Sequence, residues 1–191
     1  MTAEPREWLE ADGLGGFASG TVSGIRTRRY HAILLTARTP PTGRMVLVNG
    51  FDAFVETAAG RSALSSQRYA PGVTAPDGAS RLDSFETSPW PRWVFALPGG
   101  TRIAQELFVP NGAPAVALSW RRLAGEGPAH LEVRPFFSGR DSHALHHENP
   151  AFRFEAKESP RGLVFRPYAG VPAVSVRANG SFEPRRDWYR N

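Results

Sequence analysis

Four consecutive side chains, Arg28-Arg29-Tyr30-His31, combine two guanidinium groups, a phenol and an imidazole directly after a glycine-rich segment. Residues 13–24 contain five glycines in twelve positions, so little side-chain bulk keeps another molecule away from this part of the backbone. Arginine and histidine donate hydrogen bonds to hydroxyl oxygens, and tyrosine rings pack on apolar ring faces. The chemistry that these residue types favour is recognition of a hydroxylated ligand.

A second cluster lies far along the chain, where Arg140, Asp141 and His143 open a run that holds three of the five histidines beside two carboxylates. Histidines at this density raise the question of a metal site. Cysteine is absent and the spacing matches no standard zinc pattern, so we expect no metal. We predict instead a hydrogen-bonded group on a loop at a sheet edge, facing the same site as the first cluster.

Two tryptophans lie in the segment Pro89-Trp90-Pro91-Arg92-Trp93, where Trp90 stands between two prolines. Because proline fixes the backbone, Trp90 is a candidate stacking platform for a sugar ring. The alternative, in which both tryptophans fill the space between two sheets, is favoured on general grounds.

The opening segment from Glu7 to His31 resembles the amino-terminal domain of the bacterial and archaeal glycogen debranching enzymes, the amylo-α-1,6-glucosidase family. Members of that family carry the pattern E-W-L-x-x-N-G-L-G-G-[YF]-A-S-G-T-V-x-G-x-x-T-R-R-Y-H-G. Asp12 replaces the usual Asn and Ala32 the usual Gly. Further matches follow in family order at residues 40–41, 44–48, 69, 82–85, 89–93, 140–143 and 188–191.

The resemblance implies a β-supersandwich like the domain that precedes the catalytic barrel of glucoamylases, a galactose-mutarotase-like fold. It also implies that the acid and base carboxylates lie in an (α/α)6 barrel, of which these residues show no sign. We therefore expect residues 1–191 to form a single N-terminal domain without a catalytic residue. Glu10, Asp12, Glu86, Glu106 and Asp141 are carboxylate candidates, but no spacing pairs them as glycoside hydrolysis requires.

Composition excludes some classes of protein. With 191 residues, 41% of them hydrophobic, the chain can bury one sizeable core. The first twenty residues lack an apolar leader segment, and no run is long enough to span a membrane, so a cytoplasmic protein is expected. The net charge is +5, and Lys157 is the only lysine among 23 basic residues. The arginines are scattered, which argues against a nucleic-acid partner, and no cofactor motif is present.

Short runs with a period of two alternate with Gly, Pro and Asn clusters, which predicts an all-β, antiparallel fold of two large packed sheets. We predict strands at residues 30–36, 45–48, 52–56, 62–66, 92–97, 101–109, 116–122, 129–136, 152–156, 163–168 and 174–178. Residues 69–81 are expected to form a long loop. The glycine-rich segment does not fit a dinucleotide-binding motif, because no strand is expected before it and no helix after it.

The predicted strand beginning at Tyr30 would place Arg29 and His31 on one face of the sheet and Arg28 and Tyr30 on the other. A structural role, in which these arginines pair with Asp12 or Glu10, has about equal weight. The predicted substrate-binding residues are Asp12, Arg28, Arg29, Tyr30, His31, Trp90, Arg140, Asp141 and His143. We expect the opening loop and the two clusters to meet on one rim.

The resemblance favours a non-catalytic, carbohydrate-associated domain that packs on the downstream α-1,6-glucosidase barrel and shapes its α-glucan site. Its partners would be that barrel and an α-glucan such as glycogen, limit dextrin or maltooligosaccharide. One alternative is a free-standing glucan-binding module, which requires an exposed aromatic platform. Another is an aldose-epimerase-like enzyme on the same sandwich, which requires His143 or His31 to meet a Glu in one pocket.

Overall fold

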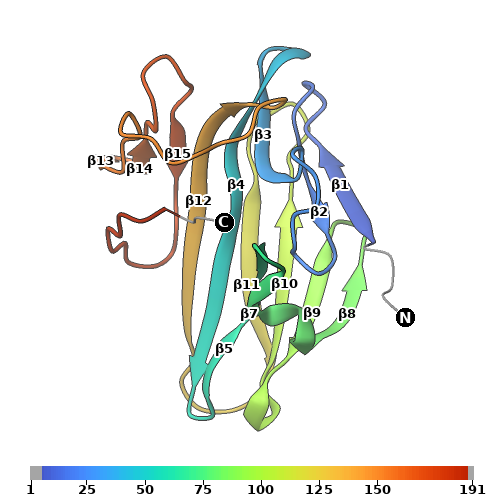
Figure 1. Cartoon of the computed structure of the whole chain (residues 1–191). Coiled ribbons are helices and arrows are strands. Elements are labelled where there is room, and N and C mark those ends of the chain that lie inside the picture. Colours follow the sequence, from blue (N-terminus) through green and yellow to red (C-terminus); the bar gives the residue numbers. More distant parts are fainter. Residues whose placement is uncertain (1–5, 189–191) are drawn as a thin grey trace.

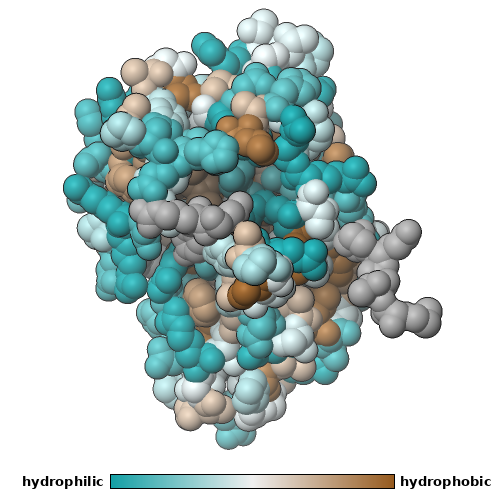
Figure 2. All heavy atoms as spheres, viewed as in Figure 1, coloured by the Kyte–Doolittle hydropathy of each residue, from teal (hydrophilic) through white to brown (hydrophobic). Residues whose placement is uncertain are grey.

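Two antiparallel sheets packed face to face make up most of the molecule, as a computed structural model shows (Figure 1). The structure describes residues 6–188; Tyr189, Arg190 and Asn191 of the predicted terminal motif lie outside this range. Figure 2 shows hydrophilic side chains over most of one face, with small separate apolar patches. Within the described residues no helix is long and apolar enough to cross a membrane. The prediction of an all-β sandwich is confirmed.

The first sheet has the strand order β1-β2-β3-β4-β12, and β5 pairs with the far end of β4. Its strands are β1 (Glu7–Ala11), β2 (Phe17–Thr21), β3 (Ala32–Thr39), β4 (Thr42–Thr57), β5 (Gly60–Ala63) and β12 (His130–Asp141). The second sheet has the order β11-β10-β9-β8, made of β8 (Leu82–Glu86), β9 (Arg92–Ala96), β10 (Arg102–Phe108) and β11 (Ala117–Ala124). The chain crosses between the two sheets after β11, through the Gly/Pro segment 125–128.

Two smaller sheets complete the fold. β6 (Ser66–Tyr69) pairs with β7 (Val73–Asp77), and β13 (Ala156–Ser159), β14 (Gly162–Phe165) and β15 (Val174–Val176) form a three-stranded sheet beside β12 (Figure 1). Short 3-10 turns occur at Gly78–Arg81 and Pro98–Gly100.

The core lies between the two large sheets. It joins Trp8, Ala18 and Val55 of the first sheet to Trp93 and Leu107 of the second. On β10, Ile103, Gln105 and Leu107 are buried while Arg102 and Phe108 are exposed, as alternation with one dry face predicts. Ala104, on the outward side of this alternation, is nevertheless buried. Alternation along residues 101–109 predicts that Ile103, Leu107 and Val109 face inward, and all three are buried.

The structure departs from the predicted elements at several places. The predicted strand 62–66 is broken, because β5 ends at Ala63 and β6 starts at Ser66. Residues 69–81 are not a long loop: Gly72 donates its N–H to the Tyr69 carbonyl (2.7 Å) and closes a hairpin into β7. Residues 45–48 and 52–56 are one continuous strand, because Asn49-Gly50 forms a bulge against β12 rather than a turn. Residues 152–155 are not a strand, since Phe152 packs on Phe154 and Tyr168 instead; β13 begins at Ala156.

The glycine-rich segment was also misread in one respect, because a strand does precede it. Gly13, Gly15 and Gly16 form the turn between β1 and β2. The backbone at Gly15 has φ = +98°, and an added Cβ would lie 2.6 Å from the Pro41 carbonyl oxygen, so only glycine fits there. The hairpin on either side still excludes a dinucleotide-binding βαβ unit.

Truncating the core should unfold the sandwich far more readily than truncating the surface. Leu107 is 1% exposed and Leu145 is 68% exposed. We expect Leu107→Ala to lower the free energy of unfolding by about 2–5 kcal/mol, through lost burial and a residual cavity. Leu145→Ala should change it by less than about 0.5 kcal/mol. Urea denaturation followed by circular dichroism measures both, and equal effects would contradict the assigned core.

Candidate functional site

The residues Arg28–His31 form a turn and not a strand. β2 ends at Thr21 and β3 starts at Ala32, and the His31 N–H donates to the Arg28 carbonyl (3.0 Å). The predicted alternation of their side chains between two sheet faces is therefore wrong. Strand pairing stops here because the backbone hydrogen bonds are made within the turn itself.

Glu7, at the start of β1, anchors one side of this turn. Its Oε1 accepts a hydrogen bond from Arg28 Nε (2.7 Å) and lies 3.5 Å from His31 Nε2. The hydrogen bond from Arg28 lowers the pKa of Glu7. Arg28 thus pairs with Glu7 rather than with the expected Asp12 or Glu10, and this part of the turn has a structural partner.

His31 is buried, only 3% exposed, and its ring is held in one protonation state. Its Nδ1 accepts the Thr27 backbone N–H (3.2 Å), which requires an unprotonated Nδ1 and places the ring proton on Nε2, towards Glu7. Burial lowers the pKa of His31, although the nearby Glu7 acts in the opposite direction. His31 supports the turn from behind and does not reach the surface.

Arg29 and Tyr30 meet the second predicted cluster. Arg29 Nη1 donates to the His143 carbonyl (2.8 Å), and the Tyr30 hydroxyl lies 3.0 Å from His143 Nδ1. The Tyr30 and His143 rings meet edge to face with centroids 5.7 Å apart. Asp141 shapes the second segment, since its Oδ1 accepts the His143 N–H (2.8 Å). The structure therefore brings together two clusters more than a hundred residues apart, and we call Arg29, Tyr30 and His143 the rim cluster.

Arg140 is the buried link between the two segments. Its guanidinium donates to the carbonyls of Arg29 and Ala144 and to Asn49 Oδ1, the last two at 2.9 and 3.3 Å. Burial lowers the pKa of Arg140, and the charges of Arg26 and Arg29 add to this effect. Arg140 fixes the rim cluster and leaves its own donors occupied, so its part is positioning.

Asp12 does not lie with the rim cluster. It is buried in the glycine turn, where its Oδ1 accepts the N–H groups of Leu14 (2.7 Å) and Gly16 (2.9 Å). This turn lies at the opposite end of the five-residue strand β1 from Glu7, packed against Pro41 and Asn111. The carboxylate holds the turn, which an Asn oxygen would do equally well, and the expected meeting of all three segments is wrong for residues 12–16.

Trp90 also lies apart, on the second sheet. It is half-buried and meets Phe108 edge to face, with centroids 5.5 Å apart, while Phe108 is 45% exposed. Trp93 fills the core between the sheets, where it meets Trp8 at 5.4 Å. The inter-sheet role is therefore correct for Trp93 but not for Trp90.

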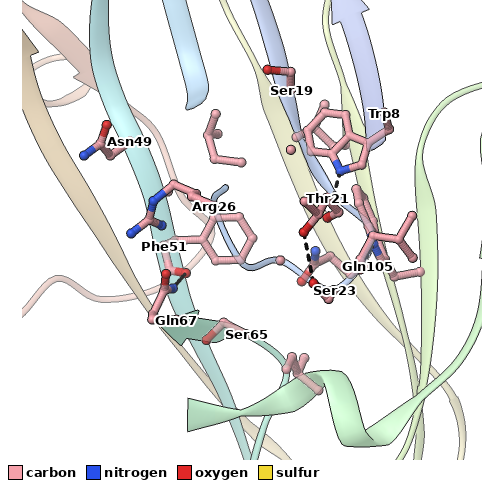
Figure 3. A pocket seen from close by; sticks show the side chains of 18 of the residues that line it. Trp8, Ser19, Thr21, Ser23, Arg26, Asn49, Phe51, Ser65, Gln67 and Gln105 are labelled. Carbon is pink, nitrogen blue, oxygen red and sulfur yellow. Dashed lines mark hydrogen bonds between the residues drawn. The ribbon is translucent and has the colours of Figure 1, made fainter. Parts of the chain in front are cut away.

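Neither a metal site nor a paired-carboxylate site forms among the described residues. Among residues 6–188 no three His, Asp or Glu side chains lie close enough together to hold a metal ion. Glu86 and Glu106 both approach Arg92 on the second sheet, at 3.7 and 3.2 Å. His31 and Glu7 do converge, as an epimerase-like site would require. However, neither residue lines the cavity that lies between the two large sheets (Figure 3).

That cavity is a feature that the sequence interpretation missed. It lies between the two large sheets and is lined by Arg26 and Gln67 among others (Figure 3). Arg26 falls at a variable position of the family pattern and Gln67 outside the matched segments, so no motif marked either residue.

Fold and site together define an all-β sandwich domain with a fixed polar and aromatic cluster where loops meet the sheet edge. Residues 6–191 match the family model described as "Glycogen debranching enzyme N terminal", so the chain belongs to that family. Comparisons with curated proteins and with solved structures gave no match.

Acid should destabilise the protein through the buried imidazole of His31 and the half-buried imidazole of His146. Burial lowers the pKa of both His31 and His146 below the ordinary value of 6.5. The unfolded chain then binds these protons at a higher pH than the folded chain does. This contribution to stability is complete above pH 6.5 and is lost as the pH falls through the lowered values.

We expect the free energy of unfolding to decrease below pH 6.5, by at most about 1.4 kcal/mol per pH unit for each histidine. His31→Asn keeps an acceptor near the Nδ1 position and removes the titrating ring, so its slope should be shallower. Urea titrations between pH 5 and 8, a window of about three units around the histidine range, measure both slopes. A wild-type slope equal to that of His31→Asn would contradict the assignment.

Proposed function

We propose that this chain is the carbohydrate-associated N-terminal domain of a glycogen debranching enzyme, packing on a C-terminal (α/α)6 catalytic domain and shaping its α-glucan site. In this proposal the acid and base carboxylates of the α-1,6-glucosidase belong to that domain. Glycogen or its limit dextrin is the substrate, and the enzyme is cytoplasmic. Family membership supports the parentage, and the rim cluster supports contact with sugar.

The observation that carries the proposal is the fixed geometry of Arg29, Tyr30 and His143. All three side chains are exposed, yet the Tyr30 hydroxyl is hydrogen-bonded to the His143 ring and the Arg29 guanidinium to the His143 backbone carbonyl. Holding such groups in place before a ligand arrives reduces the entropy that binding would otherwise cost. Remaining guanidinium donors of Arg29 and the Tyr30 ring provide the hydrogen-bonding and apolar contacts that a sugar ring needs.

Binding by the domain alone should be weak, because hydrogen bonds to sugar hydroxyls replace bonds to water and one wall of the site is provided by the partner domain. We expect maltooligosaccharides to shift the amide resonances of residues 28–31 and 141–144 in an NMR titration. Arg29→Ala should weaken binding about tenfold, the equivalent of roughly 1.4 kcal/mol. Arg121→Ala, at an exposed position on β11, is the matched control.

Shifts that map to Trp90 and Phe108 would contradict the rim assignment. They would favour the free-standing glucan-binding module, since those side chains form the partly exposed aromatic pair of the second sheet.

The purified chain of 191 residues should release no glucose from a branched limit dextrin. Glycoside hydrolysis needs two carboxyl groups placed on either side of the bond, about 5 to 10 Å apart. Asp141, the carboxylate of the second cluster, is engaged with the His143 N–H. A glucose assay on the wild type and on Asp141→Asn checks this. Release by the wild type that is lost in Asp141→Asn would overturn the non-catalytic assignment.

A further inference from the structure

The cavity between the two sheets has a volume of about 70 Å³. A water molecule needs about 10–15 Å³ on this kind of measure, so several waters or one small organic molecule fit. Figure 3 shows Arg26, Asn49 and Gln67 on one side and Trp8, Thr21 and Gln105 on the other. Two of these polar side chains have hydrogen-bonding capacity that the protein does not use.

Gln67 carries the first unused group. The side chain is 4% exposed, and its Nε2 donates to the Phe51 carbonyl (3.2 Å) and to Asp52 Oδ1 (3.0 Å). Because both of these partners are acceptors, the amide atom that faces them must be the nitrogen, which fixes the orientation of the Gln67 amide. Oε1 is left as a buried oxygen without a hydrogen-bond partner in the part of the chain that the structure describes. Leaving such an acceptor unsatisfied costs about 1–3 kcal/mol, so it calls for a donor from outside the protein.

The guanidinium of Arg26 is the second group with unused hydrogen-bonding capacity. Its guanidinium lies 5.5 Å from the Phe136 ring centre and against Gly50, where an added Cβ would approach Nη1 to 2.4 Å. Within residues 6–188 it makes no hydrogen bond and no ion pair. Burial lowers the pKa of Arg26, and the charge of Asp52 acts in the opposite direction. A guanidinium has five N–H donors, and no described residue supplies an acceptor for those of Arg26, whose side chain is only partly exposed.

The Gln67 oxygen and the Arg26 guanidinium need hydrogen-bond partners of opposite kinds. Gln67 Oε1 requires a donor and Arg26 requires an acceptor. A hydroxyl group is both, whereas an anion would satisfy Arg26 but place lone pairs towards the Gln67 oxygen. The buried carboxylate of Asp52 already offsets part of the Arg26 charge, which further favours a neutral ligand. Trp8, Phe51 and Trp93 line the remaining wall and suit a C–H skeleton.

We propose that this cavity binds one small, neutral, polyhydroxylated molecule, between glycerol and a single sugar ring in size, through hydroxyl groups placed between Arg26 and Gln67. A glucan chain is too large for it. The cavity is distinct from the rim cluster, and the proposal does not depend on the proposed function.

The test uses the whole chain, with glycerol, glucose and inorganic phosphate as separate probes. Both Trp8 and Trp93 line the cavity, so their indole N–H resonances report on its occupancy in NMR spectra. Glycerol or glucose should shift both resonances in a saturable way and raise the melting temperature. Arg26→Met and Gln67→Met should each weaken binding at least tenfold, while Arg121→Met should leave it unchanged. Arg26→Lys, which keeps the charge but not the planar fork, should give an intermediate loss.

Three results would overturn the proposal: no shift of either indole with either polyol, phosphate binding more tightly than both, or crystals soaked with glycerol or glucose that hold only water in the cavity. Glucose shifts confined to residues 28–31 and 141–144 would also overturn it while supporting a sugar site at the rim. Saturable indole shifts without any response to maltooligosaccharides at the rim would support the cavity site and count against the proposed function.

Discussion

The contact between Trp8 and Trp93 fixes the relation of the two sheets on which everything else depends. The rings meet edge to face at 5.4 Å, one from β1 and the other from β9. Each indole also donates a hydrogen bond where β2 ends: Trp8 to the carbonyl of Thr21, the last residue of β2 (3.3 Å), and Trp93 to the carbonyl of Val22, the next residue (3.0 Å). Buried indoles need such partners, and here the partners are the residues from which the 22–31 segment departs. The core contact therefore also sets where that segment begins.

A buried cation then places the far end of the same segment. Arg140 is nine-tenths buried, and its guanidinium donates hydrogen bonds to carbonyls and an amide oxygen rather than to a carboxylate. Hydrogen bonds to a charged donor are stronger than neutral ones, and desolvation makes their loss costly. Arg140 thus joins the turn before β3 to the segment after β12. As a result, the exposed side chains of Arg29, Tyr30 and His143 are held in a fixed arrangement, which is unusual for surface side chains.

Two side chains that line the inner cavity are hydrogen-bonded to residues at or beside the rim cluster. Ser19 lines the cavity and donates to the Tyr30 carbonyl (3.3 Å), and Asn49 lines the cavity and accepts from Arg140 (3.3 Å). The two features are built on the same short segment and its neighbours β2 and β4. One hydrogen bond separates Ser19 from the backbone of Tyr30, and two hydrogen bonds through Arg140 separate Asn49 from the backbone of Arg29.

The sequence by itself determined the fold class, because period-2 alternation and turn-forming Gly, Pro and Asn are local properties of the chain. Strand β10 illustrates this: its inward residues Ile103 and Leu107 follow directly from alternation. The sequence also determined the family and marked both parts of the rim cluster. Local rules failed where partners distant in sequence decide the backbone, as at Asn49-Gly50, which reads as a turn but forms a bulge beside Arg26.

Only the tertiary structure decided what each marked residue does. Arg28 contacts Glu7, His31 lies behind the turn, Asp12 closes a turn at the other end of β1, and Arg140 is a buried support. The pairing of Tyr30 with His143 and the unsatisfied oxygen of Gln67 depend on packing between residues far apart in the chain. No spacing along the sequence encodes such contacts, since they arise when two sheets close on a common core.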